Sequence, residues 1–315
     1  MCPLPDYRPG AVGIGSDTAW LTDDGAVRVV GYNDMSELMD GWVRAFTTHH
    51  PEVGFELDLC GTRFAPAALA AGASAFGPMG GEFTTGQLRD YRSVLGAAAE
   101  PLMIRVAHAS LHPKALSGPI AVFTHPDNPL RHITFQVLAD ILRGNARQWS
   151  DIPDGGAALG HAAIHPVGVR PESVIGEFVR DRVLDGRAYT DGLRAFGQSA
   201  EVVQAIAEDP LAIGYAAAMR ATAGVRMLAL SSSASQPAVL PTRETLRSGR
   251  YPLDRHLLIA VRLPVSALAG EFLSLVLSGP GQRTVASSSL GYLPLAAAEV
   301  AQERSKLAAA GFVCQ

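Results

Sequence analysis

The sequence has little lysine and little net charge. Lys114 and Lys306 are the only lysines in 315 residues, and 26 Lys and Arg against 30 Asp and Glu leave a formal net charge of −4. No run of basic residues is present. Because a protein that binds nucleic acid recruits the phosphate backbone with a basic face, this composition argues against a nucleic-acid partner.

Long apolar runs are also missing. No stretch approaches the roughly 18 consecutive apolar residues of a membrane-spanning helix, because Arg, Glu, Gly or Ser interrupts each alanine-rich run. Hydrophobic residues still make up 48% of the chain, which is enough to bury a core. At about 100–200 residues per domain, the length predicts two globular domains.

Cysteine is scarce and widely spaced. Cys2, Cys60 and Cys314 form no Cys-x-x-Cys pair, so neither a disulfide framework nor a zinc knuckle is predicted. Cys60 is expected to be a buried, inert thiol. The residues around Cys2 lack the basic and apolar regions of a signal peptide. Two interpretations of this start remain open: a cytosolic chain, or a lipoprotein that begins at a lipid-bearing Cys2.

Catalytic motifs are absent as well. The sequence has no Gly-x-Ser-x-Gly, no His-Glu-x-x-His, no Gly-x4-Gly-Lys, and no Gly-x-Gly-x-x-Gly after a strand. His108 and His112 have a metal-compatible spacing only in a helix, and Pro113 disfavours one. We therefore expect a turn with solvated imidazoles there, and the sequence predicts no enzyme, no cofactor and no metal site.

Beyond an irregular arm over residues 1–25, short strands alternate with helices. The run Val27–Val30 ends at Gly31, and apolar residues from Met35 to Phe46 then recur at steps of 3, 4 and 7. This pattern predicts a strand, a tight turn and a helix that begins with an Asp34–Glu37 capping box. Further strands are expected at 53–59, 103–107, 120–123, 164–169, 213–216, 225–230 and 257–261, and helices at 66–71, after Thr134, near Ser173, and at 268–277, 280–286 and 296–310.

This alternation predicts an α/β fold with parallel sheets that helices cover on both faces. In such sheets the ligand lies at the carboxyl ends of the strands, where helix N-termini point. The candidate site loops are 31–35, 61–63, 77–81 and 170–173. The apolar stripe of Met35, Met39, Trp42 and Phe46 is expected to be core.

Several stretches together resemble the substrate-binding proteins of phosphate ABC transporters. In family order they are Val30-Gly31-Tyr32-Asn33-Asp34, Gly61-Thr62, 72–77, 119–123, His125-Pro126-Asp127-Asn128-Pro129-Leu130, 133–152, 167–178, 209–215, Tyr251-Pro252-Leu253-Asp254-Arg255, 278–282 and Gly291-Tyr292-Leu293-Pro294-Leu295. The resemblance implies a two-lobed type II periplasmic-binding-protein fold, with two mixed or parallel sheets flanked by helices and a ligand cleft between the lobes. We divide the chain accordingly into the arm, lobe 1 at 26–117 plus 257–315, and lobe 2 at 118–256.

The family holds phosphate with helix N-termini, hydroxyls and an arginine, and the matching positions are the ligand contacts that the resemblance implies. They are Tyr32, Asn33, Asp34, Met35, Thr62, Arg63, Met79, Gly80, Arg170, Glu172 and Ser173. Several depart from the family pattern. Asp34, as a helix cap, is expected to occupy the free N–H groups and repel an anion. Met79-Gly80 replaces a Ser-Asp pair, and Val-Ile replaces Gly-Thr after Ser173.

The resemblance implies an extracytoplasmic solute-binding protein of an ABC-type transporter with a degraded phosphate site. The expected ligand is a small polar solute or an oxyanion held by Arg63 and Arg170, and the expected partner is a membrane permease or a sensor receptor. The chain is expected to act as a periplasmic or extracytoplasmic monomer, with a lipid anchor at Cys2 as one option. Two alternatives remain open: a sensing or accessory interaction module of the same fold, and a binder of an apolar ligand lined by Tyr32, Phe64 and Met79.

Overall fold

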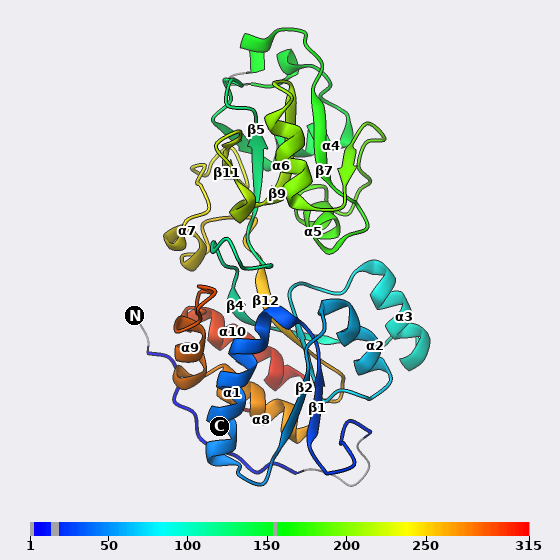
Figure 1. The fold of residues 1–315 in the computed structure, drawn as a ribbon, viewed down its shortest axis with the longest axis vertical. Helices are drawn as coiled ribbons and strands as arrows, with labels where there is room; N and C mark the ends of the chain where they lie inside the picture. The colour runs from blue at the N-terminus through cyan, green and yellow to red at the C-terminus, as the bar shows by residue number, and fades with distance from the viewer. Residues whose placement is uncertain (1–2, 14–18, 154–155, 315) are drawn as a thin grey trace. The chain divides into compact units, whose positions relative to one another are not determined.

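The computed structural model describes residues 3–13, 19–153 and 156–314, so Cys2 lies outside the described residues. The chain divides into two compact units (Figure 1). The first comprises Met1–Ser110, Lys114–Ser117 and His256–Gln315, and the second comprises Leu111–Pro113 and Gly118–Arg255. None of the helices that the described residues form is both long and apolar enough to cross a membrane.

In the first unit, two parallel strands each lead into a helix. β1 (Val27–Val30) pairs with β2 (Phe55–Asp58), and Val27 and Val29 of β1 are buried. β1 is followed by the 3-10 turn η1 (Asn33–Met35) and by α1 (Ser36–His49), and β2 is followed by η2 (Thr62–Phe64) and by α2 (Ala65–Ala70). The strand, turn and helix that the sequence predicts at the start of this unit are confirmed.

A second sheet of the first unit takes its central strand from a distant part of the chain. β12 (His256–Val261) lies between β3 (Gly77–Met79) and β4 (Leu102–His108) and is antiparallel to both. The alternation of strands and helices predicts parallel neighbours. β12 joins this sheet only after the chain has passed through the second unit, and it enters in the opposite direction, so the strands of this unit are of mixed orientation.

The helices of the first unit pack in separate groups (Figure 1). α1 contacts α8 (Ala267–Val276) and α9 (Gly279–Ala286), α2 contacts α3 (Thr85–Leu95), and α10 (Ala297–Ala309) contacts β4. Met35, Met39, Trp42 and Phe46 are fully buried, as predicted. The indole N–H of Trp42 donates a hydrogen bond to the carbonyl of Gly281 at 2.9 Å, which satisfies the polar group of this large core side chain.

The N-terminal arm is fastened to the first unit although residues 3–13 contain no helix or strand. The hydroxyl of Tyr7 and the N–H of Gly10 both donate to Oε1 of Glu271, at 2.7 and 2.8 Å. The N–H of Gly279 donates to the carbonyl of Pro5 at 2.8 Å. Glu271 is a buried carboxylate, so these donors satisfy a group that would otherwise be costly to bury.

The second unit is built on a five-stranded mixed sheet. In order, its strands are β10 (Arg226–Met227), β5 (Ile120–Thr124), β9 (Ala212–Ala217), β7 (His165–Val169) and β8 (Arg194–Phe196). β9, β7 and β8 are parallel, whereas β5 is antiparallel to its neighbours β9 and β10. The single strand predicted at 225–230 is instead β10 and β11 (Ala229–Ser231), and β11 pairs with β6 (His132–Thr134).

The described residues of this unit also form α-helices. They are α4 (Phe135–Arg143), α5 (Val174–Val183), α6 (Ser199–Ala207) and α7 (Arg243–Arg247). α6 packs on β9 and β7, and α4 contacts α5 (Figure 1). The hydroxyl of Thr134 accepts a hydrogen bond from the N–H of Val137, so the predicted cap of α4 is confirmed.

His108 is not the solvated turn residue that the sequence predicts. β4 continues through His108, and the residue is 1% exposed. Its Nε2 lies 2.9 Å from Oε2 of Glu299 on α10. The prediction was wrong because the covering helix comes from the other end of the chain, where no local pattern reveals it.

Candidate functional site

The carboxyl ends of β1 and β2 place two helix starts side by side. The N–H of Gly31 donates to the carbonyl of Asp58 at 3.0 Å, and the N–H of Gly61 donates to the carbonyl of Gly31 at 2.8 Å. These bonds extend the parallel pairing beyond the strands and into the two loops. The loops that the sequence singles out at 31–35 and 61–63 therefore lie next to each other.

Within the described part of the chain, neither of these starts is capped by a side chain. The N-cap residues are Tyr32 for η1 and Gly61 for η2, and neither position has a side-chain cap hydrogen bond. A hydroxyl fills this role at Thr84, Thr134, Ser173, Thr242, Ser266 and Ser278, whereas α6 and α10 also begin without a side-chain cap hydrogen bond. First-turn N–H groups have no acceptor within their own helix and attract anionic or polar acceptors. The pair of uncapped starts is therefore suited to bind such a ligand.

Asp34 does not cap α1, which corrects the sequence-based expectation. Its carboxylate instead accepts hydrogen bonds from the N–H of Leu116, at 2.8 Å, and from the hydroxyl of Tyr292. Burial, followed by the bond to Asp34, raises the pKa of Tyr292 and keeps its hydroxyl a donor. The predicted partner Glu37 is engaged elsewhere, because it accepts from the N–H and the hydroxyl of Ser289 at 2.9 and 2.7 Å.

A third loop, after β3, joins the first two. The N–H of Gly80 donates to Oγ1 of Thr62 at 3.0 Å. Oγ of Ser117 lies 3.1 Å from the hydroxyl of Tyr32 and 3.2 Å from the carbonyl of Gly80. The structure thus brings Tyr32, Thr62 and Gly80 together, and it adds Ser117, which no motif or spacing in the sequence indicates.

Only glycine fits at position 80. A Cβ there would lie 2.5 Å from Cε1 of Tyr32 and 2.7 Å from Oγ of Ser117. The phenol ring of Tyr32 and the hydroxyl of Ser117 therefore pack directly on the backbone of the third loop. The absence of a side chain at Gly80 leaves space that Tyr32 and Ser117 fill.

The remaining first-unit candidates divide between core and surface. Met35 and Met79 are fully buried, and Met79 belongs to a core cluster with Leu69 and Tyr91. Both methionines are therefore core residues next to the loops. Asn33 and Arg63 are exposed. The guanidinium of Arg63 lies 4.7 Å from the ring centre of its neighbour Phe64, which is 40% exposed. Arg63 therefore presents a positive charge beside an apolar ring.

Cys60 is exposed, not buried as the sequence predicts. It follows the end of β2, where the chain leaves the sheet for the surface. Its thiol donates to Oδ1 of Asp58 at 2.9 Å, and this hydrogen bond and the carboxylate charge raise the pKa of Cys60. The carboxylate therefore disfavours the thiolate, which is the reactive form of a cysteine.

In the second unit, Arg170, Glu172 and Ser173 form the loop between β7 and α5. The hydroxyl of Ser173 accepts from the N–H of Gly176 at 3.0 Å and donates to the carbonyl of Arg170 at 2.6 Å. The predicted helix start at Ser173 is confirmed, and its hydroxyl is engaged in the cap. Arg170 and Glu172 are exposed. A Cβ at Gly176 would lie 2.2 Å from the carbonyl oxygen of Arg170, so only glycine permits this close loop.

A surface hollow of the first unit lies away from the candidate loops. Trp20, Arg262 and Pro264 are among its lining residues. Because β12 runs antiparallel to β3, with Ala260 opposite Gly77, the hollow lies by the start of β3. The candidate loops lie at the end of that strand, so the hollow is not part of this site.

The fold agrees with the family to which the sequence belongs. Residues 16–280 match the model of the PBP superfamily domain, so the chain belongs to the PBP superfamily. It is 28% identical to the phosphate-binding protein PstS of Pseudomonas aeruginosa over 318 residues, which cover 96% of this chain and 90% of that protein. The predicted family resemblance is confirmed, and the similarity supports a solute-binding protein.

Solved structures show the same type II fold. A putative phosphate ABC transporter substrate-binding protein with bound phosphate from Clostridium perfringens matches with a TM-score of 0.53 and 19% identity, over 86% of this chain and all of that one. An ABC-type phosphate transport receptor from Vibrio cholerae matches with a TM-score of 0.56 and 14% identity, over 84% of this chain and 98% of that one. The predicted fold class is confirmed.

Proposed function

We propose that this chain is the extracytoplasmic solute-binding protein of an ABC-type transporter, which captures a small polar or oxyanion ligand and delivers it to a membrane permease. Membership of the PBP superfamily and the similarity to PstS support this proposal. The observation that carries it is the pair of uncapped helix starts at Tyr32 and Gly61. No bond is made or broken, because the work of such a protein is the differential stabilisation of its liganded state.

Two arginines of the candidate loops support a polar or anionic ligand. Arg63 and Arg170 are both exposed, and among the described residues neither guanidinium lies within ion-pair distance of an acidic side chain. A ligand carboxylate, sulfate or phosphate group would therefore meet an arginine that has no acidic competitor. Asp34 and Glu172 add negative charge to the same loops, which also suits a zwitterionic ligand.

We propose that free phosphate binds this chain weakly. Gly80 has no carboxylate to accept a phosphate proton, and the Ser173 hydroxyl is engaged in the cap of α5. Each lost charged hydrogen bond costs about 1.5–3 kcal/mol, which is roughly a tenfold loss of affinity or more. The carboxylate of Asp34 accepts from Leu116 and does not occupy the first-turn N–H groups. Asp34 therefore disfavours a bound anion only through its negative charge.

A ligand screen tests both parts of the proposal. The full chain is freed of ligand by unfolding and refolding, and thermal shift and calorimetry are measured with phosphate, sulfate, a zwitterionic amino acid and an apolar organic acid. We expect one polar or anionic class to raise the melting temperature by mass action, with phosphate giving only a small shift. A large shift at micromolar phosphate would show that the phosphate part is wrong, and a shift with the apolar acid alone would overturn the polar ligand class.

Variants locate the binding residues. We expect R63A and R170A each to weaken binding of the ligand found by at least about tenfold, since each removes a charged hydrogen bond. R89A is the matched control, because Arg89 is an exposed arginine on α3, outside the candidate loops, that pairs with its neighbour Asp90 at 3.2 Å. Equal affinity in all three variants would contradict the proposed site.

A further inference from the structure

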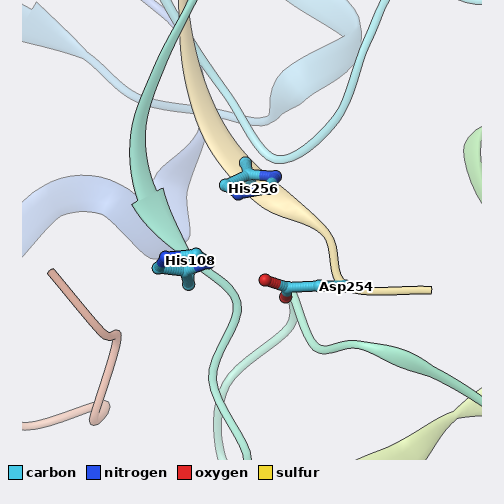
Figure 2. Close-up of side chains that lie close together, drawn as sticks. All are labelled: His108, Asp254 and His256. Carbon is cyan, nitrogen blue, oxygen red and sulfur yellow. The ribbon is translucent and has the colours of Figure 1, made fainter. Parts of the chain in front are cut away.

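Two histidines on neighbouring strands of the first unit face each other. His108 ends β4, His256 begins β12, and the two are directly opposite in the antiparallel register (Figure 2). Opposite residues of an antiparallel pair project from the same face of the sheet. The ring centres lie 4.8 Å apart, and the two imidazoles each have a ring nitrogen within 4.8 Å of the other's. Figure 2 also draws Asp254, which belongs to the second unit.

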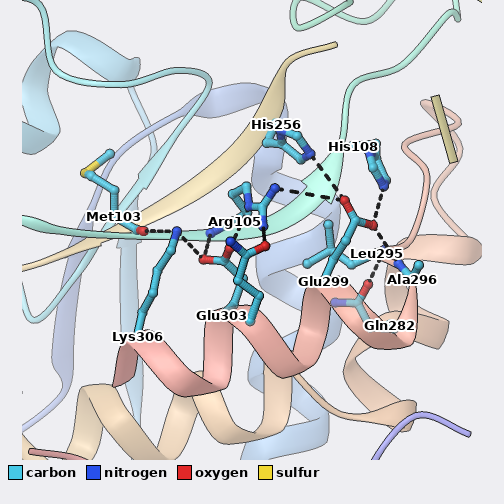
Figure 3. A network of polar contacts seen from close by, with 11 residues as sticks. Met103, Arg105, His108, His256, Gln282, Leu295, Ala296, Glu299, Glu303 and Lys306 are labelled. Atoms are coloured by element: carbon cyan, nitrogen blue, oxygen red, sulfur yellow. Dashed lines mark hydrogen bonds and ion pairs between the residues drawn. The ribbon is translucent and has the colours of Figure 1, made fainter. Parts of the chain in front are cut away.

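Glu299 on the first turn of α10 supplies a carboxylate to this pair (Figure 3). Its Oε2 lies 2.9 Å from Nε2 of His108, and its Oε1 lies 3.9 Å from Nε2 of His256. The N–H of Ala296 donates to Oε2 at 2.9 Å, which fixes the direction of the carboxylate.

The side chains of His108, His256 and Glu299 differ in their exposure to solvent. The side chain of His108 is 1% exposed, that of His256 is 15% exposed and that of Glu299 is 22% exposed. The imidazole of His108 is therefore buried, whereas His256 and Glu299 each keep part of the side chain exposed.

Neighbouring charges are already paired with each other (Figure 3). The Nε of Arg105 donates to Oε1 of the fully buried Glu303 at 2.6 Å, and Lys306 lies 2.8 Å from Oε2 of the same carboxylate. Nη1 of Arg105 lies 4.0 Å from Oε1 of Glu299. Arg105 and Lys306 thus share the carboxylate of Glu303, and Glu299 is the carboxylate that lies against the imidazoles.

We propose that His108, His256 and Glu299 form a binding site for one divalent transition-metal ion, with Zn²⁺ as its representative. Imidazole nitrogen and carboxylate oxygen are ligands that Zn²⁺ accepts, with bonds of about 2.0–2.1 Å, which place two tetrahedral ligands roughly 3.3 Å apart. The observed separations of 2.9 and 3.9 Å from Glu299 to the two imidazoles bracket that distance. Three protein ligands leave the fourth position for water.

The ion would connect three elements of the first unit. His108 lies on β4, His256 lies on β12 and Glu299 lies on α10. Bound metal would therefore fasten the C-terminal helix to the sheet in addition to the Arg105–Glu303 ion pair. A ligand that binds only the folded state raises stability by mass action, so the metal should raise the melting temperature.

The test is a Zn²⁺ titration of the full chain in which Cys2, Cys60 and Cys314 are serine, so that no thiol contributes. After removal of metal with EDTA and desalting, we expect calorimetry to give one Zn²⁺ per chain and an increased melting temperature. Co²⁺ should bind in its place and give the visible absorption of a four-coordinate ion with nitrogen ligands. E299Q, in which the Gln side chain keeps the size and can still accept from Ala296, should bind Zn²⁺ at least tenfold more weakly.

Two further variants make the result decisive. H256Q should weaken Zn²⁺ binding to the same degree as E299Q. If circular dichroism shows that E299Q does not fold, H256Q takes its place in the test. H165Q is the matched control, because His165 lies 2.8 Å from Asp209 as an imidazole–carboxylate pair without a second histidine. Wild-type affinity in E299Q and H256Q, loss of binding in H165Q, or no metal bound by the serine-substituted chain would each overturn the proposal.

Discussion

The hydroxyl of Tyr292 donates a hydrogen bond to the carboxylate of Asp34, which lies 258 residues earlier in the sequence. The same carboxylate accepts the N–H of Leu116 at 2.8 Å. Asp34 therefore connects the loop after β1 to two distant segments of the first unit. This arrangement holds the loop in place and leaves the N–H groups of the helix start open.

Loss of the Tyr292 hydroxyl should destabilise the first unit. We expect Y292F to lower the free energy of unfolding by about 1–3 kcal/mol, because it removes a buried hydrogen bond to a charged group. Urea unfolding at neutral pH measures the change. In a D34A background, Y292F should lower the free energy of unfolding clearly less. An equal decrease in both backgrounds would show that the hydrogen bond to Asp34 is not the cause.

An alanine at position 80 should disturb the third loop. The added Cβ would collide with Tyr32 and Ser117, and overpacking of this kind costs about 1–3 kcal/mol. We expect G80A to lower the midpoint of urea unfolding and to weaken binding of the ligand found in the screen. G86A is the matched control. A Cβ at position 86 would lie 4.0 Å from Oγ1 of Thr84, which is an ordinary contact, and alanine favours the helix. An equal decrease of the unfolding midpoint in G80A and G86A would contradict this account.

The contact of Glu37 with Ser289 should make stability depend on pH. Burial acts to raise the pKa of Glu37, but hydrogen bonds from Ser289 and Ser288 outweigh it and lower the pKa. The stabilisation by Glu37 is thus complete above the unfolded-state pKa of about 4.3 and is lost as the pH falls through the lowered folded-state pKa.

E37Q tests this dependence. The variant should be less stable than the wild type by at most about 1 kcal/mol at neutral pH, because the carboxylate is largely exposed. The difference should shrink as the pH falls below about 4.3. E82Q removes a carboxylate outside this contact and is the matched control for the loss of one negative charge. A constant difference for E37Q would refute the assignment.

The thiol of Cys60 should react slowly. The hydrogen bond to Asp58 and the charge of that carboxylate raise the pKa of Cys60, so less thiolate is present at any given pH. In a chain with Cys2 and Cys314 replaced by serine, D58N should speed alkylation by iodoacetamide several-fold at about pH 8.5, the ordinary thiol pKa. Equal rates in the D58N variant and in its parent chain would show that the carboxylate does not control the thiol.

The sequence predicts the elements whose signals are local. β1 and α1 follow from a β-branched run, a glycine and a regular apolar stripe, and α4 follows from Thr134 and its apolar face. α3 is missed although Thr84 and Gln87 form a capping box, because Tyr91 is its only buried residue and no apolar stripe develops. α6 is missed because the adjacent Val202 and Val203 resemble a strand.

The candidate site is predictable only in part. The position of the loops follows from the rule that ligands lie at the carboxyl ends of strands, and the structure places Tyr32, Thr62 and Gly80 together there. The partners of Asp34 and His108 are not predictable, because Tyr292 and Glu299 belong to segments about which nothing in the local sequence is informative. Whether a carboxylate caps a helix or spans to another segment depends on tertiary packing.

The central position of β12 has a consequence for how the chain acquires its structure. β3 and β4 have no strand between them until residues 256–261 have been made, whereas the second unit is complete by residue 255. During synthesis the second unit can close first, while the earlier segments of the first unit await their last strand. In a released chain truncated after residue 255, the second unit should therefore resist protease while the first stays open to cleavage.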